Sequence, residues 1–497
     1  MKTRIFKSIT RRNLLKGSAT IATGVAVGAC SEDSAVAGDP TDAASMSIGH
    51  ELPDMVWKEE EEYEFTRIAK IWNQRKPDRY PAVIAEATSQ EDCIAAVKFA
   101  KEHGLEVCPK ATGHNRNANF MRDGSMLLDT SGMTKMEVDY EKGVAIIEPG
   151  VRGGQLLSEI MPKGYFFPTA HDATVGLCGF IMGSGIGWCL NRYGVSSSSL
   201  LAVDVINAEG EVVHSNDESN SDYVWCARGA APAVFGVVTK LYLKLHPAPG
   251  AIRRSKYIYP KKHWEEITQW LMDEVQPKAS KDVEIYSFCH LKDGGMAGSG
   301  KATSQLWLTA MSDTAEEAEK ALEIFETCPV IDEVLVREYA EEVDMASSYS
   351  QFSTAAPAGY RYFVDVAYFS MDTSEFFDVS REYINDLPTP ESNYLLISMH
   401  GIEPHPNAAI SGLPCDWMGA VVGIARNPSE DEAALAWAVA SAKALEPYTS
   451  GIPMMDENLI SRPVKNILEP EKWKRYEAAR AELDPNHLFR GFLLGKA

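Results

Sequence analysis

One stretch of the chain, residues 167–194 (FPTAHDATVGLCGFIMGSGIGWCLNRYG), is unusually rich in glycine. Six glycines fall within nineteen of its residues: Gly176, Gly179, Gly183, Gly185, Gly187 and Gly194. A helix interior tolerates them poorly, because each costs about 1 kcal/mol relative to alanine. The flanking residues are apolar, which argues against a flexible linker. Since glycine lets a backbone approach a ligand closely, the stretch predicts buried backbone against a phosphate-bearing cofactor, with a glycine-rich turn in a sheet protein as the alternative.

The size and charge of the chain narrow the classes of protein to which it can belong. With 497 residues it is long enough for two or three domains. Its contents of 45% hydrophobic and 24% charged residues are typical of globular proteins. A formal net charge of −22 argues against binding to nucleic acid or to an anionic membrane surface.

The N-terminus has the form of an export signal. Residues 10–16 (TRRNLLK) carry the paired arginines of a twin-arginine signal, and a run of small and apolar residues follows over 17–29. That run is too short and too rich in Gly, Ala and Thr for a transmembrane span. The VGAC sequence ending at Cys30 is typical of a lipoprotein cleavage site, with Cys30 as the lipid acceptor. The sequence predicts a signal over 1–30, a tether over 31–55, and a location in the periplasm or on the outer face of the membrane.

Nine cysteines are present, and none of them has a CxxC or zinc-ligand spacing. Export permits disulfides, but most of these cysteines lie inside apolar runs. We therefore expect buried free thiols for most of them, and no metal site.

Two patterns of predicted elements divide the remainder of the chain. Residues 56–247 alternate short strands with helices, beginning with a helix over 59–75 and a helix capped by Ser89. Strands at 201–207 and 211–214 form a predicted hairpin. A proline-rich break at 246–250 (HPAPG) ends this pattern.

Residues 248–455 alternate strands with long amphipathic helices, and residues 456–497 form a C-terminal segment. Strands are predicted at 257–259, 284–290, 305–309, 360–368 and 393–399. Helices are predicted at 263–275, 314–325, 373–385 and 430–445. This pattern predicts an antiparallel sheet with helices on one face, so the fold class is α+β.

Short motifs follow one another along the chain in a specific order. They are KATGHN (110–115), FP…TVGLCG…GSGIG…RYG (167–194), DYVWCARG (222–229), FGVVT (235–239) and LDPNHLF (483–489). In this order they resemble the FAD-binding domain of the vanillyl-alcohol oxidase/p-cresol methylhydroxylase (PCMH) superfamily, and in particular its berberine-bridge-enzyme-like oxidases. The resemblance implies that 56–247 is a two-subdomain PCMH-type FAD-binding domain, that 248–455 is a substrate domain, and that 456–497 returns to the FAD domain.

The resemblance also assigns residues to FAD. His114 matches the histidine that is bonded covalently to the 8α-methyl group of FAD, and its loop amides would hold the pyrophosphate. In that loop, Lys110 and Thr112 replace the arginine and first glycine of the family pattern. The other positions assigned to the cofactor are Ala111, Gly113, Asn115, Gly176, Gly179, Gly183, Gly185, Gly187, Val237 and Asn486.

Two residues of the glycine-rich stretch carry specific expectations from the family. Asp172 stands where many relatives have a cysteine that makes a second bond to the flavin, so a single covalent link is predicted. Val175 occupies the position that controls oxygen access in relatives, where a small valine is typical of oxidases and a bulkier leucine of dehydrogenases.

No catalytic base is fixed by the motifs. The tyrosine of the family YxN motif is absent, and Tyr448 lies close to its position but out of register. On predicted sheet strands, His400, Tyr286, Tyr368 and Tyr362 could cover the flavin, as could the carboxylates Glu284 and Asp365. Core packing is the alternative role for each of them.

Together these features predict an exported FAD-dependent oxidoreductase. It would take hydride from an alcohol or amine carbon to flavin N5 and pass the electrons to O2, giving H2O2. A dehydrogenase with another periplasmic acceptor and a flavin-binding member without turnover are the alternatives. The substrate would be a small molecule, its identity and the oligomeric state remaining open.

Overall fold

The computed structural model describes residues 52–292, 302–454, 459 and 462–492. The predicted export signal, the proposed lipid acceptor Cys30 and all but the last residues of the tether lie outside this range. Among the described residues, no helix has the length and apolar character needed to cross a membrane.

A four-stranded sheet opens the described chain. It consists of β1 (Asp54–Trp57), β2 (Val83–Glu86), β3 (Val107–Lys110) and β4 (Met126–Asp129), in the order β1-β2-β4-β3. Strands β2, β4 and β3 are parallel, and β1 is antiparallel to β2. Helix α3 (Gln90–Glu102) connects β2 to β3, and the side chains of Ser89 and Asp92 cap each other's backbone amides at its start, which confirms the predicted cap.

A second sheet is antiparallel and packs against the glycine-rich stretch. Its strands, in the order β5-β6-β10-β8-β9, are β5 (Met136–Asp139), β6 (Val144–Ile147), β10 (Val237–Lys244), β8 (Leu200–Ile206) and β9 (Val212–Asn216). The predicted hairpin is confirmed as β8 and β9. The remaining elements of this region are α4 (Gly153–Ile160), α7 (Ser221–Ala227) and a small pair of strands, β7 (Tyr165–Phe166) and β11 (His246–Pro247).

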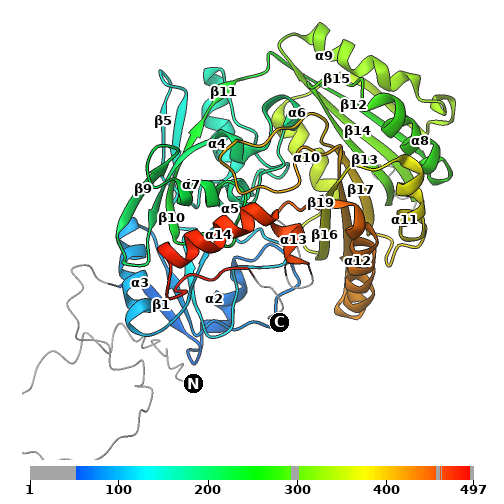
Figure 1. Cartoon of the computed structure of the whole chain (residues 1–497). Helices are drawn as coiled ribbons and strands as arrows, with labels where there is room; N and C mark the ends of the chain where they lie inside the picture. Colours follow the sequence, from blue (N-terminus) through cyan, green and yellow to red (C-terminus); the bar gives the residue numbers. More distant parts are fainter. Residues whose placement is uncertain (1–51, 293–301, 455–458, 460–461, 493–497) are drawn as a thin grey trace, which may run out of the picture. The chain divides into compact units, whose positions relative to one another are not determined.

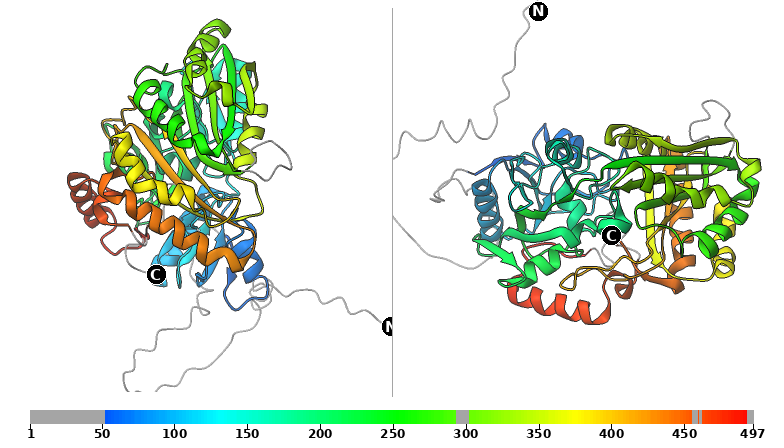
Figure 2. Two further views of the ribbon diagram at one scale, coloured as in Figure 1. Left: turned by 90° about the vertical axis from the view of Figure 1, so that its right-hand side faces the viewer. Right: turned by 90° about the horizontal axis from the view of Figure 1, so that it is seen from above.

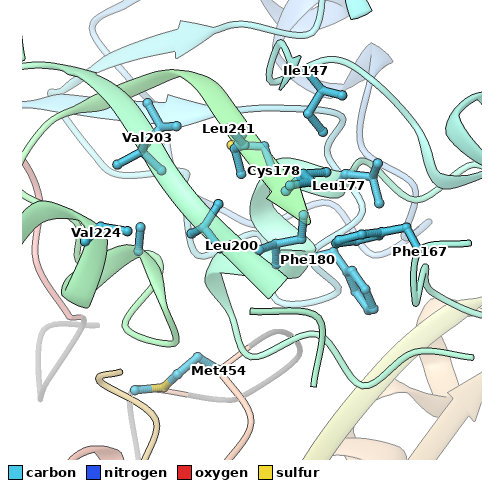
Figure 3. Close-up of a cluster of buried hydrophobic side chains, with 14 of the residues drawn as sticks. Ile147, Phe167, Leu177, Cys178, Phe180, Leu200, Val203, Val224, Leu241 and Met454 are labelled. Atoms are coloured by element: carbon cyan, nitrogen blue, oxygen red, sulfur yellow. The ribbon is translucent and has the colours of Figure 1, made fainter. Parts of the chain in front are cut away.

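Apolar residues of the glycine-rich stretch anchor it on this sheet. Phe167, Leu177 and Phe180 are buried in one cluster with Leu200 and Leu241 of β8 and β10 (Figure 3). Burying each such side chain stabilises the fold by roughly 1.5–3 kcal/mol. These apolar contacts therefore fix the glycine-rich stretch on the sheet, and its glycines are held in a defined position.

The second half of the chain forms an eight-stranded antiparallel sheet in the order β15-β12-β14-β13-β17-β18-β16-β19 (Figure 1). Its strands are β12 (Ala251–Pro260), β13 (Val283–Lys292), β14 (Ala302–Ser312), β15 (Val336–Glu342), β16 (Arg361–Phe369), β17 (Asn393–Ser398), β18 (Trp417–Ala425) and β19 (Thr449–Gly451). Helices α8 (Trp264–Trp270), α9 (Ala315–Leu322), α11 (Thr373–Asn385) and α12 (Asp431–Leu445) pack their apolar sides on one face of it (Figure 2). The α+β prediction, with helices on one face of an antiparallel sheet, is confirmed.

Several elements differ from the sequence prediction. The helix predicted over 59–75 is only α2 (Tyr63–Ala69). The chain beyond it is held by tertiary hydrogen bonds, because the Trp72 amide donates to the Gly113 carbonyl and the Asn73 side chain donates to the Tyr362 carbonyl. The glycine-rich stretch also contains two short helices, α5 (Leu177–Met182) and α6 (Leu190–Tyr193).

Several elements were not predicted, among them β15, α10 (Met345–Ala355) and β18. Strand β18 contains Gly419 and Gly423, and glycine weakens strand propensity. A Cβ atom at Gly423 would lie 2.7 Å from the Ala434 carbonyl oxygen, so glycine is what lets α12 approach the sheet. Helix α10 is rich in serine, which obscures its helical pattern.

The C-terminal segment packs on the first half of the chain. Helix α14 (Pro470–Leu483) lies along the first half of the chain (Figure 1). Its Tyr476 packs against Phe235, with ring centroids 5.1 Å apart, and its Arg475 pairs with Asp222. Phe489 then forms a parallel bridge with Val107 of β3.

Candidate active site

A deep cavity is lined by both halves of the described chain. One wall, here called the loop wall, comes from residues 110–116 and from the first half of the glycine-rich stretch. The opposite wall, the sheet wall, comes from the face of the eight-stranded sheet that lies away from α8, α9, α11 and α12. The side chains that it presents include Tyr286, Phe288, Val364, Val366, Leu395, Ile397, Met418 and Ala420.

The sheet wall follows from the two-residue period of its strands. On β13, Tyr286 and Phe288 line the cavity, whereas Val283 and Ile285 pack under the helices. Strands β16, β17 and β18 alternate in the same way. One face of the sheet is thus available to a ligand, while the other faces the hydrophobic core of the second half of the chain.

The loop wall begins with a buried ion pair at the end of β3. The Lys110 Nζ atom lies 2.7 Å from Asp129 Oδ2 on β4, and each side chain is only 4% exposed. Lys70 adds a second contact to the same carboxylate at 3.0 Å. Burial raises the pKa of the Asp129 carboxyl, but the charge and hydrogen bond of Lys110 outweigh it and hold the pKa below its usual range.

After Lys110 the backbone turns sharply towards His114. Gly113 has φ +81°, and a Cβ atom there would lie 1.8 Å from the Lys70 carbonyl oxygen, so only glycine fits. Within the described part of the chain, the amides of Thr112 and Gly113 donate no hydrogen bond, although both residues line the cavity. Together with the Lys110 side chain, these amides form a site suited to an anionic group.

A chain of hydrogen bonds orients His114. The Thr174 hydroxyl donates to Asp172 Oδ1 at 2.7 Å, and its oxygen lies 2.9 Å from His114 Nε2. Because that hydroxyl hydrogen is already used, the oxygen accepts from His114, which places the imidazole proton on Nε2 and the lone pair on Nδ1. Trp72 stacks on the ring, with centroids 5.6 Å apart, and fixes its plane.

A second histidine, His171, lines the same cavity next to Tyr286. Its Nε2 atom lies 2.8 Å from Glu284 Oε1, and the Glu284 side chain is only 2% exposed. The Tyr286 hydroxyl lies 3.2 Å from Nδ1 and 3.2 Å from Nε2 of the same ring. Phe352 and Trp188 enclose the imidazole, with ring centroids at 4.6 and 4.3 Å.

Among the four predicted catalytic candidates, the structure brings only Tyr286 to the cavity. Tyr368 is fully buried in the apolar cluster behind it. His400 is half-exposed, 3.7 Å from Asp416 through Nδ1, and Tyr448 ends a short turn at the start of β19; neither lines the cavity. His171 and Phe352 were not among the predicted site residues. The sequence offered one signal for His171, namely its position directly before Asp172. It offered none for Phe352, because the helix α10 that carries it was not predicted.

The predicted cofactor residues divide in a similar way. Those that line the cavity are Lys110, Ala111, Thr112, Gly113, His114, Asn115, Asp172, Val175, Gly176 and Gly179. Gly183, Gly185 and Gly187 do not line the cavity: Gly183 ends α5, and the Gly185 carbonyl accepts a hydrogen bond from the Ser196 hydroxyl. Val237 does not line the cavity, although its neighbours Gly236 and Val238 do. Asn486 is exposed in the C-terminal turn.

All eight described cysteines are free and buried, which confirms the expectation for them. Burial raises the pKa of the Cys178 thiol, which lines the cavity, to about 12. The thiols are therefore protonated at neutral pH and unsuited to nucleophilic attack. Among the described residues, no cluster of His, Cys, Asp and Glu forms a metal site.

Comparisons with known proteins agree with this geometry. Residues 81–216 match the family described as FAD binding domain. Over 447 residues the chain is 28% identical to the FAD-linked oxidoreductase nodO of Hypoxylon pulicicidum, covering 88% of this chain and 96% of that protein.

Solved structures share the fold. The crystal structure of 6-hydroxy-D-nicotine oxidase from Arthrobacter nicotinovorans has a TM-score of 0.75 at 20% identity and covers 90% of this chain and 98% of that chain. The structure of BBE-like #28 from Arabidopsis thaliana also has a TM-score of 0.75, at 16% identity, and covers 88% and 97% of the two chains. The fold is therefore the PCMH-type, berberine-bridge-enzyme-like fold.

Proposed function

We propose that this chain, which belongs to the FAD-linked oxidoreductases with a berberine-bridge-enzyme-like fold, is an oxidase of an apolar alcohol or amine. Bound FAD supplies the redox chemistry, since it accepts a hydride from the substrate carbon and passes the electrons to O2, giving H2O2. The observation that carries the proposal is the cavity itself, because anion-binding loop residues and an apolar sheet face line the same space.

The loop wall fits the cofactor. The amides of Thr112 and Gly113 and the Lys110 ammonium group suit the diphosphate, and Gly179 leaves open space where a side chain would obstruct a ligand. His114 lines the cavity with its ring stacked on Trp72, at the position that the family resemblance gives to the covalent flavin link. Asp172 cannot form a thioether, so we propose a single covalent link, through His114.

The sheet wall suggests the class of substrate. The cavity residues of β16 and β18 are all apolar, and Asn393 is the polar exception on β17. An apolar wall binds apolar surface and penalises unpaired charges. A neutral substrate with an apolar body and one oxidisable hydroxyl or amine therefore fits best.

Val175 supports O2 as the electron acceptor. It is half-buried at the cavity, where the family resemblance gives a small valine to oxidases. A bulkier side chain there would narrow the approach to the flavin.

We also propose that the enzyme works outside the cytoplasm. The paired arginines at 11–12 and the following run of small residues are typical of twin-arginine export, and Cys30 is placed for lipid attachment. This route carries folded proteins, which suits an enzyme that acquires its cofactor before export.

A substrate screen tests the proposal. Purified holoenzyme is mixed without oxygen with neutral primary and secondary alcohols and amines of increasing apolar size, and flavin bleaching is followed. We expect bleaching by apolar members of the set, and one H2O2 per substrate when air is admitted. Flavin that is reduced by light but by no member of the set would indicate a protein without turnover. Dye reduction without H2O2 in air would indicate a dehydrogenase.

A further inference from the structure

A polar cluster lies at the sheet wall of the cavity, where three titratable side chains are joined in a row. Glu284 and Tyr286 project from the same face of β13, two residues apart, and His171 reaches them from the loop wall. The row joins the two walls of the cavity. Of the three residues, Tyr286 and His171 line the cavity and Glu284 lies behind them.

The direction of the hydrogen bonds follows from the chemistry of each group. Glu284 Oε1 lies 2.8 Å from His171 Nε2, and an ionised carboxylate only accepts, so the imidazole proton is on Nε2. The Tyr286 hydroxyl lies 3.2 Å from both ring nitrogens of His171, and with Nε2 protonated only Nδ1 has a lone pair to accept its hydrogen. The phenol oxygen keeps its lone pairs for a ligand in the cavity.

Burial explains why the phenol needs a partner. Desolvation and the nearby Glu284 charge raise the pKa of Tyr286 well above its usual value, so its hydroxyl is protonated. A protonated phenol accepts a substrate proton only if its own proton leaves in the same step. His171 Nδ1 is the acceptor in contact with it.

Aromatic side chains pack around the row and hold it in place. Trp188 and Phe352 enclose His171. Phe352 also packs edge-on against Tyr286, with ring centroids 4.8 Å apart. Tyr349, whose ring packs against Trp188, is hydrogen-bonded to Thr169 at 2.8 Å. In such an environment a carboxylate stabilises a neighbouring imidazolium strongly.

Building on the proposed function, we propose that Tyr286, His171 and Glu284 form the proton relay of the oxidation. Tyr286 is the catalytic residue that takes the proton of the substrate hydroxyl or amine, His171 receives the phenol proton, and Glu284 is a positioning residue that orients and stabilises the imidazolium. This assigns a base where the sequence motifs left none.

The step balances in atoms and charge. The substrate O–H or N–H bond breaks and a new O–H bond forms on Tyr286, while its original proton moves to His171 Nδ1. The substrate carbon loses a hydride to the FAD of the proposed function and becomes a carbonyl or imine carbon. The substrate is oxidised by two electrons, and the imidazolium returns its proton to solvent after product leaves.

Matched variants test the relay in the holoenzyme. The probe is the alcohol or amine that bleaches wild-type flavin fastest in the screen, and the rate of anaerobic bleaching is measured. We expect Tyr286→Phe and His171→Ala each to lose about 10²–10⁴-fold, the range for general acid–base catalysis. The double variant should lose little more than either single variant, because members of one relay are not additive.

Two controls separate a relay from a structural role. Tyr394→Phe removes another buried phenol from the helix-facing side of the same sheet, and the bleaching rate should stay within about twofold of wild type. Free imidazole should restore part of the rate in His171→Ala but none in Tyr286→Phe. Fully additive losses, or a Tyr286→Phe rate close to wild type, would overturn the relay.

A measurement that needs no substrate turnover tests the relay separately from the proposed oxidase function. In holoenzyme with ¹⁵N-labelled histidine, we expect His171 to be protonated on Nε2, and Tyr286→Phe to move only the Nδ1 resonance because that atom loses its donor. An unchanged Nδ1 resonance would contradict the relay. If no compound bleaches wild-type flavin, the proposed function fails, and the resonance still decides whether the relay geometry exists.

Discussion

The two walls of the cavity are built by opposite means. The loop wall consists of backbone, glycine and a few charged groups, namely the amides before His114, the Lys110–Asp129 pair and the Asp172–Thr174–His114 chain. The sheet wall consists of side chains on strands, mostly apolar, with one polar row ending at Tyr286. A wall of backbone amides suits a fixed cofactor, whereas a wall of side chains can be altered residue by residue without disturbing the backbone. We infer that cofactor and substrate specificity are separable in this molecule.

Removing the charge at Asp129 should disturb the loop wall most. Asp129→Asn leaves Lys110 buried without its counter-ion, which costs about 3–5 kcal/mol of unfolding free energy at neutral pH. Denaturant unfolding of both proteins measures this difference. Leu128→Ala, on the same strand, controls for the loss of ordinary packing.

The same pair predicts an acid limit to stability. The folded pKa of Asp129 is lowered, so its contribution is present above the unfolded pKa, near 4, and is lost as the pH falls below that value through the folded pKa. The difference between wild type and Asp129→Asn should therefore shrink below about pH 4. A difference that is independent of pH would show that the pair does not titrate as described.

Breaking the chain that orients His114 should impair attachment of the flavin. Thr174→Val removes the hydroxyl that links Asp172 to His114 Nε2, and we expect attachment to slow about 10–100-fold, the range for partners that orient a histidine ligand. Adding FAD to apoprotein and following acid-stable flavin with time measures this rate. Thr174→Ser keeps the hydroxyl and should attach flavin normally.

A change in the sheet wall should alter substrate binding and leave the cofactor in place. Met418→Ala shortens a side chain that lines the cavity, and KM for an apolar substrate should rise about tenfold. Val421→Ala, on the helix-facing side of the same strand, lowers stability without changing KM. Loss of flavin from Met418→Ala would contradict the separation of the two walls.

Val175, on the loop wall, tests the identity of the electron acceptor. Val175→Leu should slow flavin reoxidation by O2 about fivefold, close to 1 kcal/mol, and leave reduction by substrate unchanged. Stopped-flow mixing of the reduced enzyme with oxygen measures the first rate. Equal rates of reoxidation would remove Val175 as support for O2 as acceptor.

The two walls also differ in how much of them could be predicted from sequence. The residues of the loop wall lie in short motifs, where local glycine spacing and the position of His114 indicate the site directly. The sheet wall draws alternate residues from β13, β16, β17 and β18, and antiparallel pairing over long separations decides which of them meet. His171 lay in a quoted motif, yet its partner Glu284 is 113 positions away, so its role depended on the fold.

The fold class was predictable because strand and helix periods are local. Helix lengths were less so, as α2 shows, where hydrogen bonds from Trp72 and Asn73 end the helix. Strand β18 was not predicted because its glycines serve the packing of α12 instead of the strand itself.

Peptide mapping of the denatured wild-type protein tests the central claim most directly, namely that the loop wall holds FAD through His114 alone. Protein purified with its flavin is denatured, digested and analysed by mass. We predict that flavin stays attached after denaturation, that the peptide carrying His114 gains the mass of FAD, and that the peptide carrying Asp172 gains none. Release of all flavin on acid precipitation, or its attachment to another residue, would contradict the account.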